Sequence, residues 1–248
     1  MNFSNNKVLI TGGSSGLGLE LSKRLLDKQN KVIICGSTKE KLLEAQKKHP
    51  ELEIFQCDLS ENNQCIDLAN WIEKNHSDLN VLINNAAIVH VTPFLEGDNI
   101  IQKAELETQV NFLAPLRLIK YMYPILKRNS NPTIINVTTG LIYAPRVDYS
   151  FYNATKAALH SFTQVLRMQL SKTKIKVIEV MYPAVDTPWH KGNPPKIAIS
   201  TSKAVNEMIR GLEKGQAEIK VGGVKILYAL TRIAPRFALQ KINSLNNE

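Results

Sequence analysis

Tyr152 and Lys156 carry the side chains best suited to proton transfer in this sequence. They stand four residues apart in a segment, 152–171, whose pattern predicts a helix, so both side chains project from one helix face. A phenol has an ordinary pKa of about 10, and a nearby ammonium group favours its phenolate form. The pair could therefore move a proton to or from a substrate oxygen. Taken alone, the same spacing is more typical of a solvated helix face.

A glycine-rich stretch near the N-terminus could hold phosphate groups. It follows the apolar run Val8-Leu9-Ile10 directly and leads into an amphipathic segment. A strand that ends in such a loop and opens a helix lets backbone N–H groups approach a pyrophosphate at the positive end of the helix dipole. The spacing Gly-x-x-x-Gly-x-Gly differs from the general fingerprint, and a glycine turn without a ligand is the alternative. The phosphate-binding residues predicted here are Gly12, Ser14, Ser15, Gly16, Leu17 and Gly18.

Apolar runs alternate with helical patterns along the chain, and these elements must position the two groups above. Strands are predicted at 7–11, 31–36, 53–56, 80–84, 132–137, 175–180 and 218–221. Helices are predicted near 17–28, 39–48, 61–75, 103–128, 152–171 and 201–214. This βαβ pattern predicts an α/β fold, a single-domain doubly wound parallel sheet (Rossmann fold) of about seven strands with helices on both faces. Four prolines make 183–200 a poor helix and a candidate lid beside the site.

Composition narrows the class of protein. A chain of 248 residues with 44% hydrophobic residues can bury one sizeable core. Three cysteines form no CxxC pair, which favours reduced thiols that pack as small apolar groups. The N-terminus has no apolar leader and no apolar run is long enough to span a membrane. We therefore expect a cytoplasmic protein.

Metal and nucleic acid are not expected as partners. The five histidines show no metal-ligand spacing. Either His90 or His190 could line a substrate cleft, but solvent-facing loop positions are the favoured interpretation for both. The net charge of +9 assists the binding of anionic cofactors. No nucleic-acid-binding motif accompanies it.

Four motifs together resemble the short-chain dehydrogenase/reductase family over residues 7 to about 222. They are the Thr11–Gly18 loop, Asn84-Asn85-Ala86-Ala87, Asn111 and Tyr152-Asn153-Ala154-Thr155-Lys156. Within the family, the stretches 32–36 and 152–163 look most like the DltE-type branch. The resemblance implies an oxidoreductase that uses a nicotinamide cofactor.

The resemblance also implies roles for four catalytic residues. Tyr152 would be the general acid/base, and Lys156 would also hydrogen-bond the nicotinamide ribose. Asn111 would hold a water that links Lys156 to solvent, although it could instead be a polar residue that kinks a helix. Thr139, 13 residues before Tyr152, stands where the family has serine and would polarise the substrate carbonyl. Threonine keeps the hydroxyl but adds a methyl group and a stiffer χ1.

Further cofactor contacts are implied beyond the glycine loop. Asn85 and Ala86 would lie at the adenine-ribose side, while Pro183, Val185 and Thr187 would meet the nicotinamide carboxamide. Alanine replaces the usual glycine at positions 87 and 184. After the third strand, Asp58 and Leu59 resemble the adenine-binding residues. Asp58 could equally be a turn residue, with Ser60 as the cap of the next helix.

The end of the second strand favours NADP(H) over NAD. NAD-selective sites place an acidic residue there to accept the ribose hydroxyls, and that carboxylate repels a 2′-phosphate. This chain has Ser37, Thr38 and Lys39 instead, two hydroxyl donors and a cation. The arginine common at the Ser37 position in NADP-dependent relatives is also missing. Ser37 and Thr38 could also cap the following helix.

We therefore expect an NADP(H)-dependent enzyme that interconverts a carbonyl compound and a secondary alcohol, and that forms a homodimer or homotetramer. Apolar residues near the site suggest a moderately hydrophobic small-molecule substrate. Because Thr139 replaces serine, a cofactor-binding sensor or scaffold with little turnover is the alternative. The predicted catalytic domain spans 1–222, and 223–248 forms a basic amphipathic extension that Pro235 interrupts or divides into two helices. Packing on the body or a second subunit is the favoured role of this extension over peripheral membrane contact.

Overall fold

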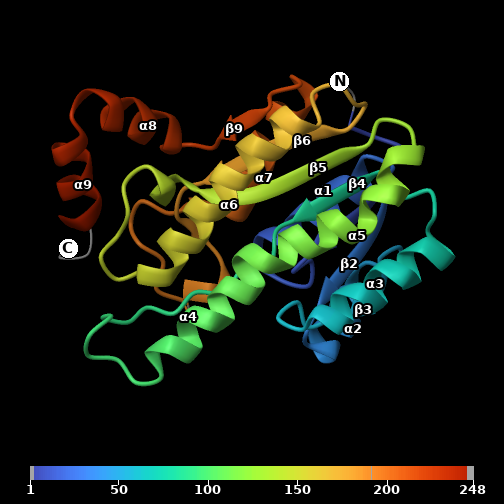
Figure 1. The fold of residues 1–248 in the computed structure, drawn as a ribbon, viewed down its shortest axis with the longest axis horizontal. Helices are drawn as coiled ribbons and strands as arrows, with labels where there is room; N and C mark the ends of the chain where they lie inside the picture. Colours follow the sequence, from blue (N-terminus) through green and yellow to red (C-terminus); the bar gives the residue numbers. More distant parts are fainter. Residues whose placement is uncertain (1–2, 191, 245–248) are drawn as a thin grey trace.

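A computed structural model describes residues 3–190 and 192–244. Its centre is a seven-stranded parallel sheet with the strand order β3-β2-β1-β4-β5-β6-β9 (Figure 1). The strands are β1 (Lys7–Thr11), β2 (Lys31–Gly36), β3 (Glu53–Gln56), β4 (Val81–Asn84), β5 (Thr133–Thr139), β6 (Lys176–Tyr182) and β9 (Glu218–Lys220). The predicted doubly wound Rossmann-type fold is confirmed. All strands are parallel, and the direction in which successive strands are added to the sheet reverses between β1 and β4, where such folds bind their ligands.

Helices cover both faces of the sheet and bury a separate apolar cluster on each. One face carries α1 (Gly16–Asp27), α2 (Lys39–Lys48) and α7 (Thr201–Glu213). The other carries α3 (Asn62–Asn75), α5 (Ala114–Arg128) and α6 (Ser150–Gln169). Central strands such as β4 are buried throughout, because helices shield them on both sides. The three cysteines are buried and free.

The helix predicted at 103–128 is not continuous. It consists of α4 (Ile100–Thr108), a π-helical turn η1 (Gln109–Leu113) and α5. Pro115 cannot donate the regular hydrogen bond to the carbonyl of Asn111, and the Asn111 side chain bonds outside the helix. The interruption therefore lies at a residue already predicted to be functional.

The proline-rich segment 183–200 has more regular structure than we predicted. It contains β7 (Val185–Asp186), a 3₁₀ turn η3 (Pro188–His190) and β8 (Ile199–Ser200), and the two short strands pair in parallel. The pairing ties both ends of the segment together and brings its start close to α7.

The C-terminal extension forms two helices, α8 (Val224–Ile233) and α9 (Pro235–Ser244), and Pro235 begins the second. Both project from one end of the molecule (red in Figure 1). Across the described ranges, no helix is long and apolar enough to cross a bilayer, and no cluster of three or more His, Cys, Asp or Glu side chains could hold a metal ion. The division at residue 222 stays a prediction.

Candidate active site

Strand β5 and helix α6 bring three of the predicted catalytic residues together. Thr139 ends β5, and Tyr152 and Lys156 lie in the first two turns of α6. The Lys156 Nζ donates a hydrogen bond to the Val137 carbonyl at 2.8 Å and lies 5.9 Å from the centre of the Tyr152 ring. Lys156 is only 1% exposed. The ammonium group is thus fixed behind the phenol by the strand.

Burial shifts the pKa values of both proton carriers toward their neutral forms. It raises the pKa of Tyr152 well above its ordinary value, while a hydrogen bond with the Thr139 side chain lowers it in part. Burial also lowers the pKa of Lys156 to about 8, against the opposing charge of Glu179. The protein groups alone therefore hold Tyr152 as a neutral phenol, the form that can donate a proton. The phenolate form expected from the sequence would need the ammonium group and the positively charged oxidised nicotinamide together.

Thr139 lies at the point where β5 ends and a 3₁₀ turn, η2 (Gly140–Ile142), begins. Its Oγ1 accepts a hydrogen bond from Leu141 N and donates to the Tyr182 carbonyl, both at 3.3 Å. These contacts hold the hydroxyl beside the Tyr152 phenol. Thr139 and Tyr152 can therefore address one substrate oxygen.

A buried acid that the sequence did not single out lies behind Lys156. Glu179 on β6 is fully buried and accepts hydrogen bonds from the Thr138 hydroxyl at 2.6 Å and from the His160 ring. His160 is one turn beyond Lys156 on α6 and reaches the surface beside Gln164. The sequence did not indicate the pairing of His160 with Glu179, because the two residues lie on separate elements that only the fold brings together.

Catalysis that depends on the Lys156 ammonium is expected to fall as the pH rises through about 8, because Lys156 loses its proton there. The Glu179 charge raises this pKa, so Glu179→Gln should move the fall in kcat/KM to lower pH. A pH profile of kcat/KM for both proteins measures the shift. Glu218→Gln is the matched control, because Glu218 is the register partner of Glu179 but pairs with Arg167 and Lys220. An unmoved profile in Glu179→Gln would contradict this role.

Asn111 fixes the loop that follows β4. Its amide oxygen accepts from Ile88 N at 2.9 Å, and its Nδ2 donates to the Ile88 carbonyl at 2.8 Å. The same Nδ2 lies 3.3 Å from Thr155 Oγ1, next to Lys156 on α6. Asn111 thus connects the π-helical turn to the catalytic helix, and the water-holding role stays a prediction.

His90 is not the solvent-facing residue that we expected. Its backbone N and its ring Nδ1 both contact Glu107 Oε1, at 2.6 and 3.0 Å, and Glu107 is fully buried. Burial raises the pKa of Glu107, while the contacts with His90 lower it. The sequence did not indicate this pair, because Glu107 lies on α4, 17 residues after His90 in the preceding loop. His190 packs its ring against Trp189, with centroids 4.5 Å apart.

The glycine loop has the close backbone packing that a dinucleotide site requires. Gly12 and Gly16 have φ of +65° and +52°. A Cβ on Gly18 would collide with the Gly12 carbonyl and the Asn85 side chain. Ser15 precedes α1 but its side chain makes no capping hydrogen bond, and no acidic residue lies in the first turn. The first N–H groups of α1, among them those of Gly16, Leu17 and Gly18, can therefore serve a phosphate, and these residues fit a dinucleotide.

Polar contacts join this loop to the end of β4. Thr11 Oγ1 accepts hydrogen bonds from the backbone N of Asn85 at 2.9 Å and of Ala86 at 3.0 Å, and the Asn85 amide donates to the Thr11 carbonyl. Thr187 approaches from the other side, since a Cβ on Gly16 would lie 3.5 Å from it. The structure thus gathers the glycine loop, Asn85, Ala86 and the 183–187 segment around one place.

The residues predicted to select the cofactor lie at the end of β2. Ser37, Thr38 and Lys39 are exposed, and Ser14 Oγ lies beside Gly36. Thr38 precedes α2 but makes no side-chain cap, so the capping alternative is not seen for it.

The residues predicted to hold the adenine lie in a turn after β3. Asp58 Oδ1 accepts from Ser60 N and Oγ, at 2.9 and 2.7 Å. Ser60 does not cap α3, because Glu61 is the residue before that helix. Leu59 is buried next to the turn.

Aromatic side chains line the approach to Tyr152. The Tyr149 ring lies 6.4 Å from the Tyr152 ring and 6.0 Å from Trp189. Phe94 packs edge-on against Phe151 at 6.2 Å.

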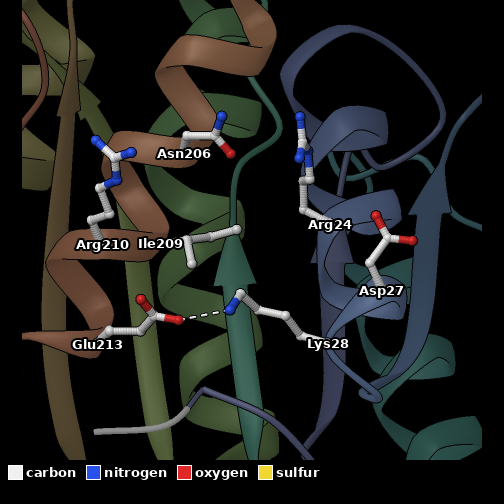
Figure 2. A pocket seen from close by; sticks show the side chains of 7 residues that line it. All are labelled: Arg24, Asp27, Lys28, Asn206, Ile209, Arg210 and Glu213. Atoms are coloured by element: carbon white, nitrogen blue, oxygen red, sulfur yellow. Dashed lines mark hydrogen bonds and ion pairs between the residues drawn. The ribbon is translucent and has the colours of Figure 1, made fainter.

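A separate hollow lies between α1 and α7, away from the catalytic helix. It has a volume of about 310 Å³, and its charged lining includes an ion pair between Lys28 and Glu213 (Figure 2). Arg24 also lines it, but its side chain is bound to Glu20 and Ser202. None of the predicted catalytic residues lines it.

Known proteins resemble this chain over most of its length. The short chain dehydrogenase family model matches residues 6–198. The oxidoreductase DltE of Bacillus subtilis is 39% identical over 252 residues, covering 100% of both chains. A fatty acyl-CoA reductase of Acinetobacter baylyi is 30% identical, over 75% of this chain and 65% of its own.

Solved structures share the fold. A short chain dehydrogenase from Burkholderia cenocepacia, in complex with NADP, superposes with a TM-score of 0.86 at 26% identity, covering 97% of this chain and 98% of that one. One from Burkholderia phymatum, in complex with NAD, has a TM-score of 0.83 at 17% identity, covering 97% and 96%. Together with the glycine loop after β1 and the Tyr152–Lys156 pair on α6, these matches establish that the chain belongs to the short-chain dehydrogenase/reductase family and is an NAD(P)-dependent oxidoreductase.

Proposed function

We propose that this protein reduces a carbonyl compound with NADPH, and that it oxidises the corresponding secondary alcohol in the reverse direction. The observation that carries the proposal is the site at the end of β5. There the Tyr152 phenol lies beside the Thr139 hydroxyl and in front of the buried Lys156 ammonium. Carbonyl polarisation needs a hydroxyl donor, and proton transfer needs an acid next to it with a cation nearby.

Each group has a defined task in the reductive direction. Thr139 donates a hydrogen bond to the carbonyl oxygen, and Tyr152 donates its proton to the same oxygen. The nicotinamide, when bound, supplies the hydride that reaches the carbonyl carbon. Burial raises the pKa of Tyr152, which keeps the phenol protonated until that step. Lys156 compensates the negative charge that the phenol then acquires, because its ammonium is fixed nearby by Val137.

The preference for NADPH rests on the end of β2. Ser37, Thr38 and Lys39 are exposed and offer hydroxyl groups and a cation where NAD-selective sites have a carboxylate. The Burkholderia cenocepacia relative, which holds NADP, supports the same choice. A direct titration of the purified protein with NADPH and NADH, followed by nicotinamide fluorescence at fixed salt, tests the preference. Tighter binding of NADH would overturn it.

Ser37→Asp is expected to weaken NADPH binding by roughly tenfold or more, because the new carboxylate repels the 2′-phosphate. The same carboxylate can accept the ribose hydroxyls of NADH, so the Kd for NADH should fall. Both Kd values are measured by the same fluorescence titration. Asn63→Asp, which adds the same charge to an exposed position on α3, should leave both unchanged. If both variants lost the same affinity for NADPH, the loss would come from the lower net charge of the protein and not from the position of the new carboxylate.

The proposed substrate class is a moderately hydrophobic carbonyl compound. Tyr149 and Trp189 form an apolar wall beside Tyr152, and Phe94 and Phe151 lie near it. A panel of aliphatic, aromatic and polar carbonyl compounds, assayed with NADPH, tests this class. Selective turnover of the polar compounds would contradict it.

A further inference from the structure

The helices α8 and α9 combine exposed apolar side chains with a positive charge that no acidic residue of these helices offsets. Residues 219–244 contain the basic residues Lys220, Lys225, Arg232, Arg236 and Lys241 and no acidic residue. Lys220 pairs with Glu218, while the other four are exposed. Among them stand Ile226 at 73% and Ile233 at 85% exposure, together with the exposed Phe237 and Leu239. We call these eight exposed residues the α8–α9 surface.

The other side of α8 is firmly packed on the body. Val224 is buried, and a Cβ on Gly140 would lie 2.9 Å from its side chain. The Tyr228 ring packs against the Tyr143 ring at 5.0 Å. Ile226 and Ile233 are one heptad apart and thus lie on the opposite, outer face of the helix, with Lys225 and Arg232 at its border. The helix is therefore held with its second apolar stripe turned away from the protein.

Helix α9 is joined to the loop that leads into the catalytic helix α6. Asn243 on α9 binds the backbone of the 145–147 loop, accepting from Val147 N at 2.8 Å and donating to the Pro145 carbonyl at 3.0 Å. That loop leads into α6, and its Val147 is strongly exposed. Beyond it, Thr92 N donates to the Asp148 carbonyl, next to the exposed Phe94 and Leu95. Exposed apolar residues thus run from α8 to the loops beside Tyr152.

The charge of the α8–α9 surface decides what can cover it. A second copy of this chain, docked by the same surface around a twofold axis, would bring its cations against each other. An anionic lipid surface instead attracts each cation, and its acyl boundary can accept the exposed apolar side chains. We propose that the α8–α9 surface binds an anionic lipid bilayer and holds the active-site mouth against it. This proposal does not depend on the substrate or on the cofactor.

Vesicle flotation with the full chain tests the proposal. The wild-type protein is expected to float with phosphatidylglycerol-containing vesicles but not with pure phosphatidylcholine vesicles, and high salt should release it. Ile226→Ser/Ile233→Ser removes the centre of the apolar stripe, and Lys225→Glu/Arg236→Glu reverses two charges. Each variant should lower the vesicle partition coefficient by roughly tenfold or more. All four side chains are exposed, so the fold should persist, as circular dichroism can verify.

Matched controls separate this surface from general effects of charge and hydrophobicity. Lys47→Glu/Lys48→Glu makes the same charge change on α2, at the other edge of the sheet, and Leu43→Ser removes an exposed apolar side chain there. Both controls should float like the wild type. Absence of flotation, or equal losses in controls and test variants, would overturn the proposal. The proposal would also be overturned if the wild-type protein were an oligomer in the absence of vesicles and the Ile226→Ser/Ile233→Ser variant were not, because the surface would then be a subunit contact.

Discussion

Replacing Tyr152 with phenylalanine is expected to lower kcat for carbonyl reduction by about 10²–10⁴, the usual contribution of a positioned general acid. The substitution removes one hydroxyl and keeps the ring between Tyr149 and Lys156. The Kd for NADPH should therefore stay close to that of the wild type. Steady-state kinetics with NADPH, combined with a fluorescence titration, measures both quantities.

Tyr149→Phe is the matched control, because Tyr149 lies just before α6 with its ring 6.4 Å from that of Tyr152. Of these two tyrosines, Tyr152 is the one hydrogen-bonded to Thr139 and the one with a lysine four residues further along the chain. We expect Tyr149→Phe to keep most of the kcat. If the two variants lost activity equally, the assignment of Tyr152 as the proton donor would be wrong.

Lys156→Gln should lower kcat by about 10²-fold or more, because no cation would then compensate the charge left on Tyr152. Lys156 is 1% exposed and donates to Val137 at 2.8 Å, and glutamine can still offer a donor to that carbonyl. The pH dependence near 8 that Lys156 produces should also vanish. A pH profile of kcat therefore distinguishes a lost charge from a general loss of structure.

Lys203→Gln, at an exposed position on α7, provides the control for removing a positive charge elsewhere. Thermal unfolding of both variants shows whether the buried substitution weakens the fold. Full activity in Lys156→Gln, with the pH dependence unchanged, would contradict the role that we assign to this residue.

Local patterns predicted the central strands because they are short, largely apolar runs that helices cover on both sides. The Val81–Asn84 strand is such a run, and its neighbours followed from the βαβ order. The spacing of Tyr152 and Lys156 likewise depends only on helix geometry, and the structure places both on α6, which corresponds to the helix predicted at 152–171. The catalytic roles themselves stay predictions for the variants above.

Contacts between distant segments could not be predicted in this way. The pairs Glu107–His90 and Glu179–His160 each join an acid buried in one element to a histidine on another. The π-helical turn at Asn111 also depends on a partner, Ile88, 23 residues earlier in the chain. Such groups have no periodic signature, because burial and pairing arise only when the sheet brings the segments together.

Transfer of the hydride from cofactor to substrate can be followed with an isotope label. The protein is incubated with NADPH in which both C4 hydrogens of the nicotinamide are replaced by deuterium, together with a panel of hydrophobic carbonyl compounds, and the alcohols are analysed by mass spectrometry. We predict that deuterium appears on the former carbonyl carbon of at least one product, and that Tyr152→Phe nearly abolishes this product. Tight binding of NADPH without deuterium transfer to any compound would contradict the account and favour a cofactor-sensing protein.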